Sequence, residues 1–341
     1  MALIKLAKEV EARRQELLRR INMAPNGTAT IVRMRSDLLR IIKECPHLVP
    51  IDADLKHLLS SWFNQGFLTL ERINWETPAI VLEKLIEHET VHAMKGWADL
   101  RSRLAEDRRC FAFFHPALPN EPLIFVEVAL AKGLATSIEP IIDEQREISN
   151  PSYADTAVFY SINNCQEGLY GISFGNFLIK QVVQELSHEF PHLQNYSTLS
   201  PMPGFCKWLK VVIDNPGKYA IPDDNLALLG QLHGNSWFQD SESVESLKPL
   251  LIGLAAYYLM HAKKGNEPLD RVARFHLRNG AILERINWLG DCSDNGIRKS
   301  AGMLVNYVYR PSLIISNHES YVKNHTLAIS PNVAKLVPKT L

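Results

Sequence analysis

Residues 159–180 read FYSINNCQEGLYGISFGNFLIK, and this stretch decides the fold. The segment 156–162 is short, apolar and aromatic, which predicts a buried strand. Apolar side chains then recur every four residues across 176–190, which predicts an amphipathic helix that Pro191 ends. Residues 196–199 predict a second short strand. The stretch therefore predicts a unit of strand, glycine-bearing loop, helix and strand.

The loop in this unit carries Gly168, Gly171 and Gly175 directly before the predicted helix. Glycine lets the backbone come close to a ligand, and a helix N-terminus offers free N–H groups and a positive dipole end to an anion. The pattern is neither the dinucleotide fingerprint G-x-G-x-x-G nor a P-loop. Both a phosphate site and a simple turn remain open from the spacing alone.

The composition restricts the class of protein. At 341 residues, the chain is long enough for one large domain with a smaller partner. Its 37 basic and 37 acidic residues balance, so no overall field favours nucleic acid or an anionic membrane. Five scattered cysteines without a C-x-x-C pair favour a reducing cytoplasm, and no apolar run approaches the ~20 residues of a membrane helix.

The rest of the chain predicts a helical module followed by mixed structure. Helices are expected at 3–21, 28–44, 52–62, 78–104 and 241–263, and strands at 66–75, 109–115 and 123–130, the last two as an antiparallel hairpin. The hexapeptide LERINW occurs at 70–75 and again at 283–288, and we interpret both copies as strand segments. This order of elements indicates an α+β protein.

A formal H-E-x-x-H motif lies at His88-Glu89-Thr90-Val91-His92, inside the predicted helix 78–104. On a helix its two histidines would lie one turn apart and suit Zn²⁺, with the glutamate as base. No third histidine or second acidic motif follows. The alternative is a solvated polar helix face, and we favour it and expect no metal.

Several ordered motifs resemble a known family. They are FYSI (159–162), GNFLIK (175–180), EFPHL (189–193), LSPMPGF (199–205) and FHLRNGA (275–281). Together they resemble malonyl-CoA decarboxylase over about residues 28–321. The resemblance implies an N-terminal helical domain used for homo-oligomer contacts, at 1–62 and shorter than in the family. It also implies a GNAT-like, N-acetyltransferase-type domain that binds acyl-CoA, at 63–341.

The resemblance also implies a site. Ser200 and His276 match the family's catalytic pair, and Tyr309 matches a tyrosine near the active site, although core packing explains it almost as well. The substrate-binding segment matches Tyr170, Gly171, Ile172, Ser173, Phe174, Gly175 and Asn176. Malonyl-CoA would be converted to acetyl-CoA and CO₂ without metal or organic cofactor, because the thioester carbonyl accepts the electrons. By themselves, Ser200 and His276 would more often be structural residues.

Three other functions remain open from the sequence. A CoA-dependent acetyltransferase would share the fold but need an acceptor amine. A zinc hydrolase would use His88 and His92. A non-catalytic acyl-CoA-binding protein would bind without turnover, since fold alone does not fix function.

Overall fold

The computed structural model describes residues 12–172, 175–219, 221–232 and 237–338. The chain divides into two compact units. The first unit comprises Met1–Leu104, Arg109–Glu127 and Ile162–Glu185, and the second comprises Ala105–Arg108, Val128–Ser161 and Leu186–Leu341.

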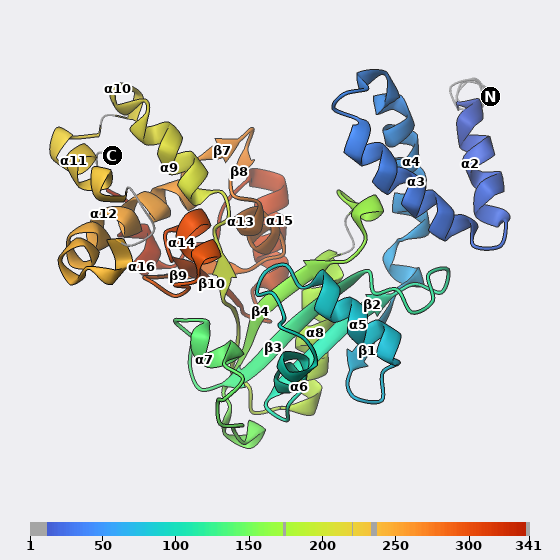
Figure 1. Ribbon diagram of the computed structural model, residues 1–341, viewed down its shortest axis with the longest axis horizontal. Helices are drawn as coiled ribbons and strands as arrows, with labels where there is room; N and C mark the ends of the chain where they lie inside the picture. The colour runs from blue at the N-terminus through green and yellow to red at the C-terminus, as the bar shows by residue number, and fades with distance from the viewer. Residues whose placement is uncertain (1–11, 173–174, 220, 233–236, 339–341) are drawn as a thin grey trace. The chain divides into compact units, whose positions relative to one another are not determined.

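The first unit begins with three helices that pack on one another, drawn in blue in Figure 1. They are α2 (Arg13–Met23), α3 (Gly27–Ile41) and α4 (Val49–Trp62). Arg35 of α3 is buried, and its Nε lies 2.8 Å from an Asp52 carboxylate oxygen. Its Nη1 donates to the Gly168 carbonyl at 2.7 Å. A buried guanidinium needs such partners, so Arg35 ties the helices to the glycine-bearing loop at Gly168.

The rest of the first unit packs around a small sheet segment. Strand β1 (Thr69–Ile73) runs antiparallel to β2 (Arg108–Phe114), with Ile73 opposite Cys110. Helices α5 (Ala79–His88) and α6 (Trp97–Arg103) follow β1 in the chain. Their apolar faces, including Val81, Leu85 and Leu100, form one core with the inward side chains of the strands.

The second unit is built around strand β10 (Leu304–Tyr309), whose six residues are all buried. Along one edge β10 pairs antiparallel with β5 (Asn195–Thr198) and then with β6 (Ser200–Pro201). Along its other edge it pairs antiparallel with β9 (Ile282–Asn287). Strand β5 also pairs in parallel with β4 (Thr156–Asn164).

The main sheet has the strand order β1-β2-β3-β4-β5-β10-β6, with β9 paired to β10. Strand β3 is Ile124–Ala131, and both β3 and β4 contribute residues to each unit. A separate two-stranded sheet joins β7 (Lys263–Lys264) to β8 (Glu267–Pro268). The mixture of parallel and antiparallel pairs beside separate helical segments confirms the α+β prediction.

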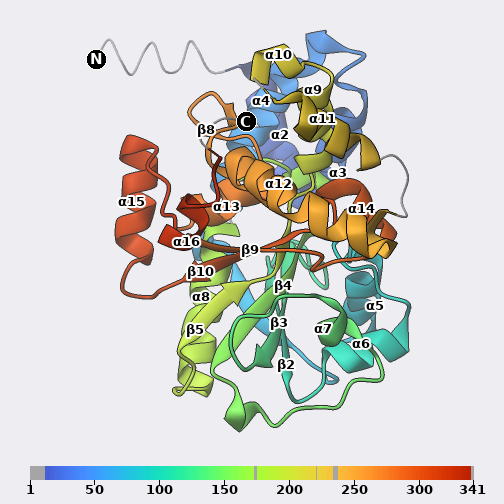
Figure 2. The ribbon, with the colours of Figure 1, turned by 90° about the vertical axis from the view of Figure 1, so that its left-hand side faces the viewer.

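Helices of the second unit cover β9 and β10. Figures 1 and 2 show α12 and α16 beside β9, and α13 beside α15. After β4 come α8 (Gly175–Glu189), which belongs mainly to the first unit, and then α9 (Phe205–Ile213), α10 (Pro216–Tyr219), α11 (Asp223–Leu229), α12 (Ser241–Met260), α13 (Arg271–Arg278), α14 (Asp294–Ser300), α15 (Ile314–Asn324) and α16 (Pro331–Ala334); α7 (Glu139–Ile142) precedes β4.

Most predicted elements are confirmed. Strand β4, helix α8 and strand β5 follow in the predicted order, and most of each LERINW copy lies in a strand, β1 or β9. Strands β2 and β3 are neighbours in the sheet. The first helix is described only from Arg13, because residues 1–11 lie outside the described part of the chain.

The predicted helix over 78–104 is wrong in its middle. It is two helices, α5 and α6, separated by an irregular segment. The Glu89 carboxylate accepts the backbone N–H groups of Val91 and His92, each at 2.8 Å, which holds a turn in place of the helix. Gly96 then adopts φ = 123°, a conformation that the α-helix does not use.

Candidate functional site

Ser200 lies in β6, two residues beyond the end of β5, and is buried. Val305 of β10 is its partner across the antiparallel pair. The Ser200 Oγ atom has two polar neighbours, Thr198 Oγ1 at 3.0 Å and His276 Nε2 at 3.2 Å. Thr198 and Ser200 are two positions apart on an extended backbone, so their side chains point to the same side.

His276 comes from α13, whose position is fixed by its N-cap. Asp270 accepts the backbone N–H groups of Val272 and Ala273, each at 2.9 Å. His276 lies in the last turn of the helix and is buried. Its ring stacks on Tyr307, with 4.7 Å between ring centroids. The packing of α13 against β10 therefore sets the orientation of the imidazole.

Both ring nitrogens of His276 are hydrogen-bonded. Nε2 faces Ser200 Oγ, and Nδ1 lies 2.8 Å from the hydroxyl oxygen of Tyr309. Burial lowers the pKa of His276 to about 3, because an imidazolium would lose its hydration. Burial also raises the pKa of Tyr309 well above its usual value. At neutral pH the pair is therefore a neutral imidazole and a neutral phenol.

The structure thus brings together three predicted residues, Ser200, His276 and Tyr309. It adds Thr198, which the sequence analysis missed. We call the hydrogen-bonded series Thr198, Ser200, His276 and Tyr309 the polar relay. The signal that could have revealed Thr198 is its i, i+2 spacing from Ser200 on a predicted strand.

Asn306 braces the polar relay from β10, and the sequence analysis missed it too. Its Nδ2 donates to the Thr198 carbonyl at 2.7 Å and to the Ala135 carbonyl at 3.1 Å. Its Oδ1 accepts from Arg285 Nε at 3.0 Å and from Asn287 Nδ2 at 2.9 Å. A buried amide with all of these bonds satisfied has a single orientation. Asn306 therefore fixes the backbone at Thr198.

The predicted substrate-binding segment 170–176 lies in the first unit and is described in part. Tyr170 is 72% exposed, and Gly171 has φ = 77°, a conformation that favours glycine. A Cβ atom at Gly171 would lie 3.6 Å from Nζ of Lys56, so a cation from α4 sits over this part of the loop. Ile172 is half-buried.

Of the other four predicted residues in this segment, two lie outside the described residues and two are described by their backbone alone. Ser173 and Phe174 lie outside the described residues. Helix α8 begins at Gly175 and continues through Asn176, and for these two only the backbone is described.

Both readings of the H-E-x-x-H motif need correction. Helix α5 ends at His88, so His88 and His92 are not one helical turn apart. Glu89 and His92 are buried, so the segment is not a solvated helix face either. Glu89 accepts from Asn163 Nδ2 at 2.7 Å as well as from the backbone of its own turn. Its role in the described structure is to hold this turn.

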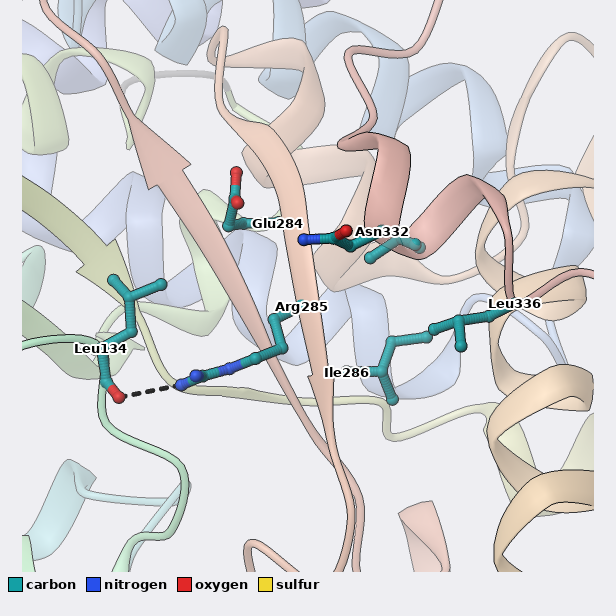
Figure 3. A pocket seen from close by; sticks show the side chains of 7 residues that line it. Leu134, Glu284, Arg285, Ile286, Asn332 and Leu336 are labelled. Atoms are coloured by element: carbon teal, nitrogen blue, oxygen red, sulfur yellow. Dashed lines mark hydrogen bonds between the residues drawn. The ribbon is translucent and has the colours of Figure 1, made fainter.

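The described residues also line a pocket of about 310 Å³ in the second unit (Figure 3). Its walls come mainly from β9 and α16, and its lining residues are Leu134, Glu284, Arg285, Ile286, Asn332, Val333 and Leu336. Arg285 extends toward Leu134 and donates to its carbonyl oxygen at 2.8 Å. Arg285 also donates to Asn306, which donates to the Thr198 carbonyl, so this pocket is linked to the polar relay through Arg285 and Asn306.

Over the described ranges, no three His, Cys, Asp or Glu side chains are grouped so that they could hold a metal ion. None of the helices in the same ranges combines the length and apolar character needed to cross a membrane.

Comparison with known proteins shows to which family the chain belongs. The family model for the malonyl-CoA decarboxylase C-terminal domain matches residues 66–341, and the model for the N-terminal domain matches residues 1–63. The mitochondrial malonyl-CoA decarboxylase of Rattus norvegicus is 37% identical over 345 residues, covering 94% of this chain and 70% of the rat protein.

Solved structures agree with the family models. The malonyl-CoA decarboxylase of Rhodopseudomonas palustris is 52% identical with a TM-score of 0.94, covering 99% of this chain and 78% of that one. The Agrobacterium vitis enzyme is 48% identical with a TM-score of 0.94, covering 99% and 83%. By these matches, the chain belongs to the malonyl-CoA decarboxylase family.

Proposed function

We propose that this protein converts malonyl-CoA to acetyl-CoA and CO₂, using Ser200 and His276 as its catalytic pair and no metal or organic cofactor. Family membership supports the substrate. The observation that carries the choice of residues is the polar relay, in which Ser200 Oγ lies 3.2 Å from His276 Nε2 and Tyr309 lies 2.8 Å from Nδ1.

The reaction sets three requirements. The bond between the carboxylate carbon and the α-carbon breaks, and its electron pair moves toward the thioester carbonyl, which gives CO₂ and an enolate. The α-carbon then takes up one proton, which the solvent finally supplies. The protein must hold the carboxylate in a reactive orientation, stabilise the enolate oxygen and deliver that proton.

His276 delivers the proton as a neutral imidazole. Its pKa of about 3 means that no imidazolium is present at neutral pH, so the proton comes from a ring N–H. An enolate carbon is a far stronger base than imidazole and can accept this proton. A hydrogen bond from Tyr309 to Nδ1 stabilises the ring after the transfer. Neutral histidine serves a comparable electrophilic role in triosephosphate isomerase.

Ser200 orients the malonyl group by hydrogen bonding rather than by forming an acyl-enzyme. Leu199 and Pro201 flank it in place of the G-x-S-x-G elbow that exposes nucleophilic serines. Its hydroxyl is fixed between Thr198 and His276, which suits a positioning group next to the proton donor.

The segment 170–176 binds the phosphates of the CoA portion. Gly171 allows close backbone approach, the N-terminus of helix α8 begins within the segment at Gly175, and the Lys56 ammonium adds positive charge. Residues 63–341 form the catalytic domain with a GNAT-like acyl-CoA fold.

Residues 1–62 mediate self-association of the protein. Large apolar side chains on this helical part are exposed to solvent, including Leu17 (58%) and Val49 (52%). Such side chains are the kind that oligomer contacts cover.

The test incubates the purified protein, treated with a chelator, with malonyl-CoA and no acceptor, and follows acetyl-CoA and CO₂ by mass spectrometry. Equal amounts of both products are expected. Ser200→Ala and His276→Gln should each lower kcat by about 100-fold or more, while CoA binding changes little. The matched control is Ser197→Ala, because Ser197 is a buried serine of β5 whose hydroxyl points to the Thr198 carbonyl.

Two outcomes would overturn the proposal. Intact malonyl-CoA with retained binding would indicate a binding protein, or an acyltransferase if product appears only after an amine is added. Wild-type turnover in both Ser200→Ala and His276→Gln would remove this pair from the mechanism.

A further inference from the structure

Thr198 makes three hydrogen bonds with one hydroxyl group. Its Oγ1 accepts the backbone N–H of Tyr307 at 3.1 Å. It also accepts from Ser200 Oγ at 3.0 Å and donates to the Val305 carbonyl at 3.5 Å. A hydroxyl has one proton and two acceptor positions, so these three bonds use its full capacity. Thr198 is fully buried, and two of its partners belong to the backbone of β10.

These bonds determine the direction of every other bond in the polar relay. A backbone N–H can only donate and a carbonyl can only accept, so Thr198 has no second proton to give to Ser200. Before substrate binds, the single Ser200 proton therefore goes to Thr198, and Ser200 must accept at its contact with His276. The donor in that contact is an Nε2–H group. Nδ1 then carries no proton and accepts from Tyr309.

We propose that Thr198 is a positioning residue that holds His276 in the tautomer with its proton on Nε2. This inference rests on the proposed function for its catalytic meaning, since Nε2 is the nitrogen that faces Ser200 and would supply the proton to the enolate. The tautomer itself follows from the hydrogen bonds of the folded protein alone.

The surroundings favour a fixed tautomer. Asn306 holds the Thr198 carbonyl, and Tyr307 both donates its N–H to Thr198 and stacks its ring on His276. Burial lowers the pKa of His276, so the ring stays neutral and must choose one of two tautomers. Each tautomer gives a different direction of hydrogen bonding through Ser200 and Tyr309.

Removing the Thr198 hydroxyl should reverse the direction of the hydrogen bonds along the polar relay. In Thr198→Val the Ser200 proton loses its acceptor and turns to His276 Nε2. The ring proton then moves to Nδ1 and is donated to Tyr309. The proton needed by the substrate would lie on the wrong nitrogen, although Ser200 and His276 are both intact.

The experiment records ¹H–¹⁵N correlation spectra of the full-length protein labelled with ¹⁵N-histidine. Comparison with His276→Gln identifies the His276 signals among the 12 histidines of the chain. Nε2 of the wild type should appear as a protonated, pyrrole-type nitrogen and Nδ1 as a pyridine-type nitrogen. Thr198→Val should exchange the two, and Thr198→Ser, which keeps the hydroxyl, should not.

Kinetics give the second readout. Thr198→Val should lower kcat by about 100-fold with KM within about twofold, and Thr198→Ser should recover most of the loss. Thr156→Val is the matched control, because Thr156 is a fully buried threonine of β4 that bonds to Asp155. It should leave both the tautomer and kcat unchanged.

Each outcome decides the inference. A wild-type His276 protonated on Nδ1, or an unchanged tautomer in Thr198→Val, overturns it. If Thr198→Val does not fold, the wild-type and Thr198→Ser spectra still test it, since both must show Nε2–H. A wild type that shows Nε2–H but leaves malonyl-CoA intact would refute the proposed function while supporting the assigned tautomer.

Discussion

The Nδ1 atom of His276 lies 2.8 Å from the Tyr309 hydroxyl oxygen, and both side chains are buried. Among the described residues, Tyr309 makes no other hydrogen bond through this hydroxyl. Tyr309→Phe removes the bond without changing the ring, and we expect kcat to fall by about tenfold, as for the loss of one hydrogen bond. Steady-state kinetics on malonyl-CoA measure the effect, and KM should stay within about twofold.

The matched control for this change is Tyr196→Phe. Tyr196 is the register partner of Tyr309, is equally buried, and bonds through its hydroxyl to Ser187 instead of to the polar relay. An equal loss of kcat in both variants would show that Tyr309 acts only through general packing.

Because His276 is buried as a neutral imidazole, the protein should become less stable at acidic pH. Its pKa is about 3 when folded and about 6.5 when unfolded, so the unfolded chain binds the extra proton between these values. The stabilisation is complete above pH 6.5 and is lost as pH falls toward 3. From pH 7 to pH 5, wild type should lose about 2 kcal/mol more of its free energy of unfolding than His276→Gln.

Urea unfolding at the two pH values, followed by tryptophan fluorescence, measures this difference. His188→Gln, at an exposed position of α8, serves as the control and should follow the wild type. Equal losses in wild type and His276→Gln would mean that His276 is not held neutral.

Because of Glu127, the protein should become less stable as the pH rises above neutral. Its carboxylate lies 3.0 Å from Arg103, which also pairs with Asp99 at 2.7 Å, and all three are buried. Burial and the neighbouring Glu89 carboxylate raise the pKa of Glu127 to about 8. The folded state therefore retains a proton that the unfolded chain releases, and stability falls as pH rises from about 4.5 to about 8.

Glu127→Gln keeps a polar side chain beside Arg103 but cannot titrate. Between pH 6 and pH 8.5, its free energy of unfolding should fall by about 2 kcal/mol less than that of the wild type. Glu71→Gln, at an exposed position of β1, is the control. A variant with the same pH dependence as the wild type would assign the base sensitivity to other groups.

Gly280 should tolerate no side chain. It has φ = 83°, and a Cβ atom there would lie 2.1 Å from the Ile314 carbonyl oxygen at the start of α15. Gly280→Ala should therefore cost more than about 2 kcal/mol, because backbone strain is added to a backbone clash. Thermal unfolding measures the loss.

Gly265→Ala separates these two contributions. Gly265 also has a positive φ of 63°, but nothing lies within 4 Å of its added Cβ. It should cost only about 1 to 2 kcal/mol. Equal losses at the two glycines would show that α15 moves away from Gly280 without cost.

The sequence predicted what local patterns encode. The four-residue spacing of apolar residues in α8 and the short aromatic run of β4 are local patterns, so they predict helix and strand without knowledge of tertiary contacts. The motifs around Ser200 and His276 led to residues that the fold does bring together. Their roles in catalysis stay predictions until the variants are measured.

The misses have a common cause, which is hydrogen bonding between side chains and backbone that sequence periodicity does not record. The Glu89 carboxylate accepts the backbone N–H groups of the turn that follows α5, and the helix ends there. Thr198 acquires its importance from the N–H of Tyr307, more than 100 residues away in the chain. In the sequence, Asn306 is an ordinary strand residue, and only the fold shows its hydrogen bond to the Thr198 carbonyl.

Strand β10 has a consequence for the synthesis of the chain. It holds β5 and β6 on one edge and β9 on the other, and it supplies Tyr309 to a histidine 33 residues earlier. Chains emerge from the ribosome N-terminus first. A nascent chain that has not released Tyr309 therefore cannot assemble the polar relay, however much of the remaining sheet has formed. The presence of the relay therefore reports that synthesis has passed Tyr309 and that β10 has taken its place beside β5 and β6.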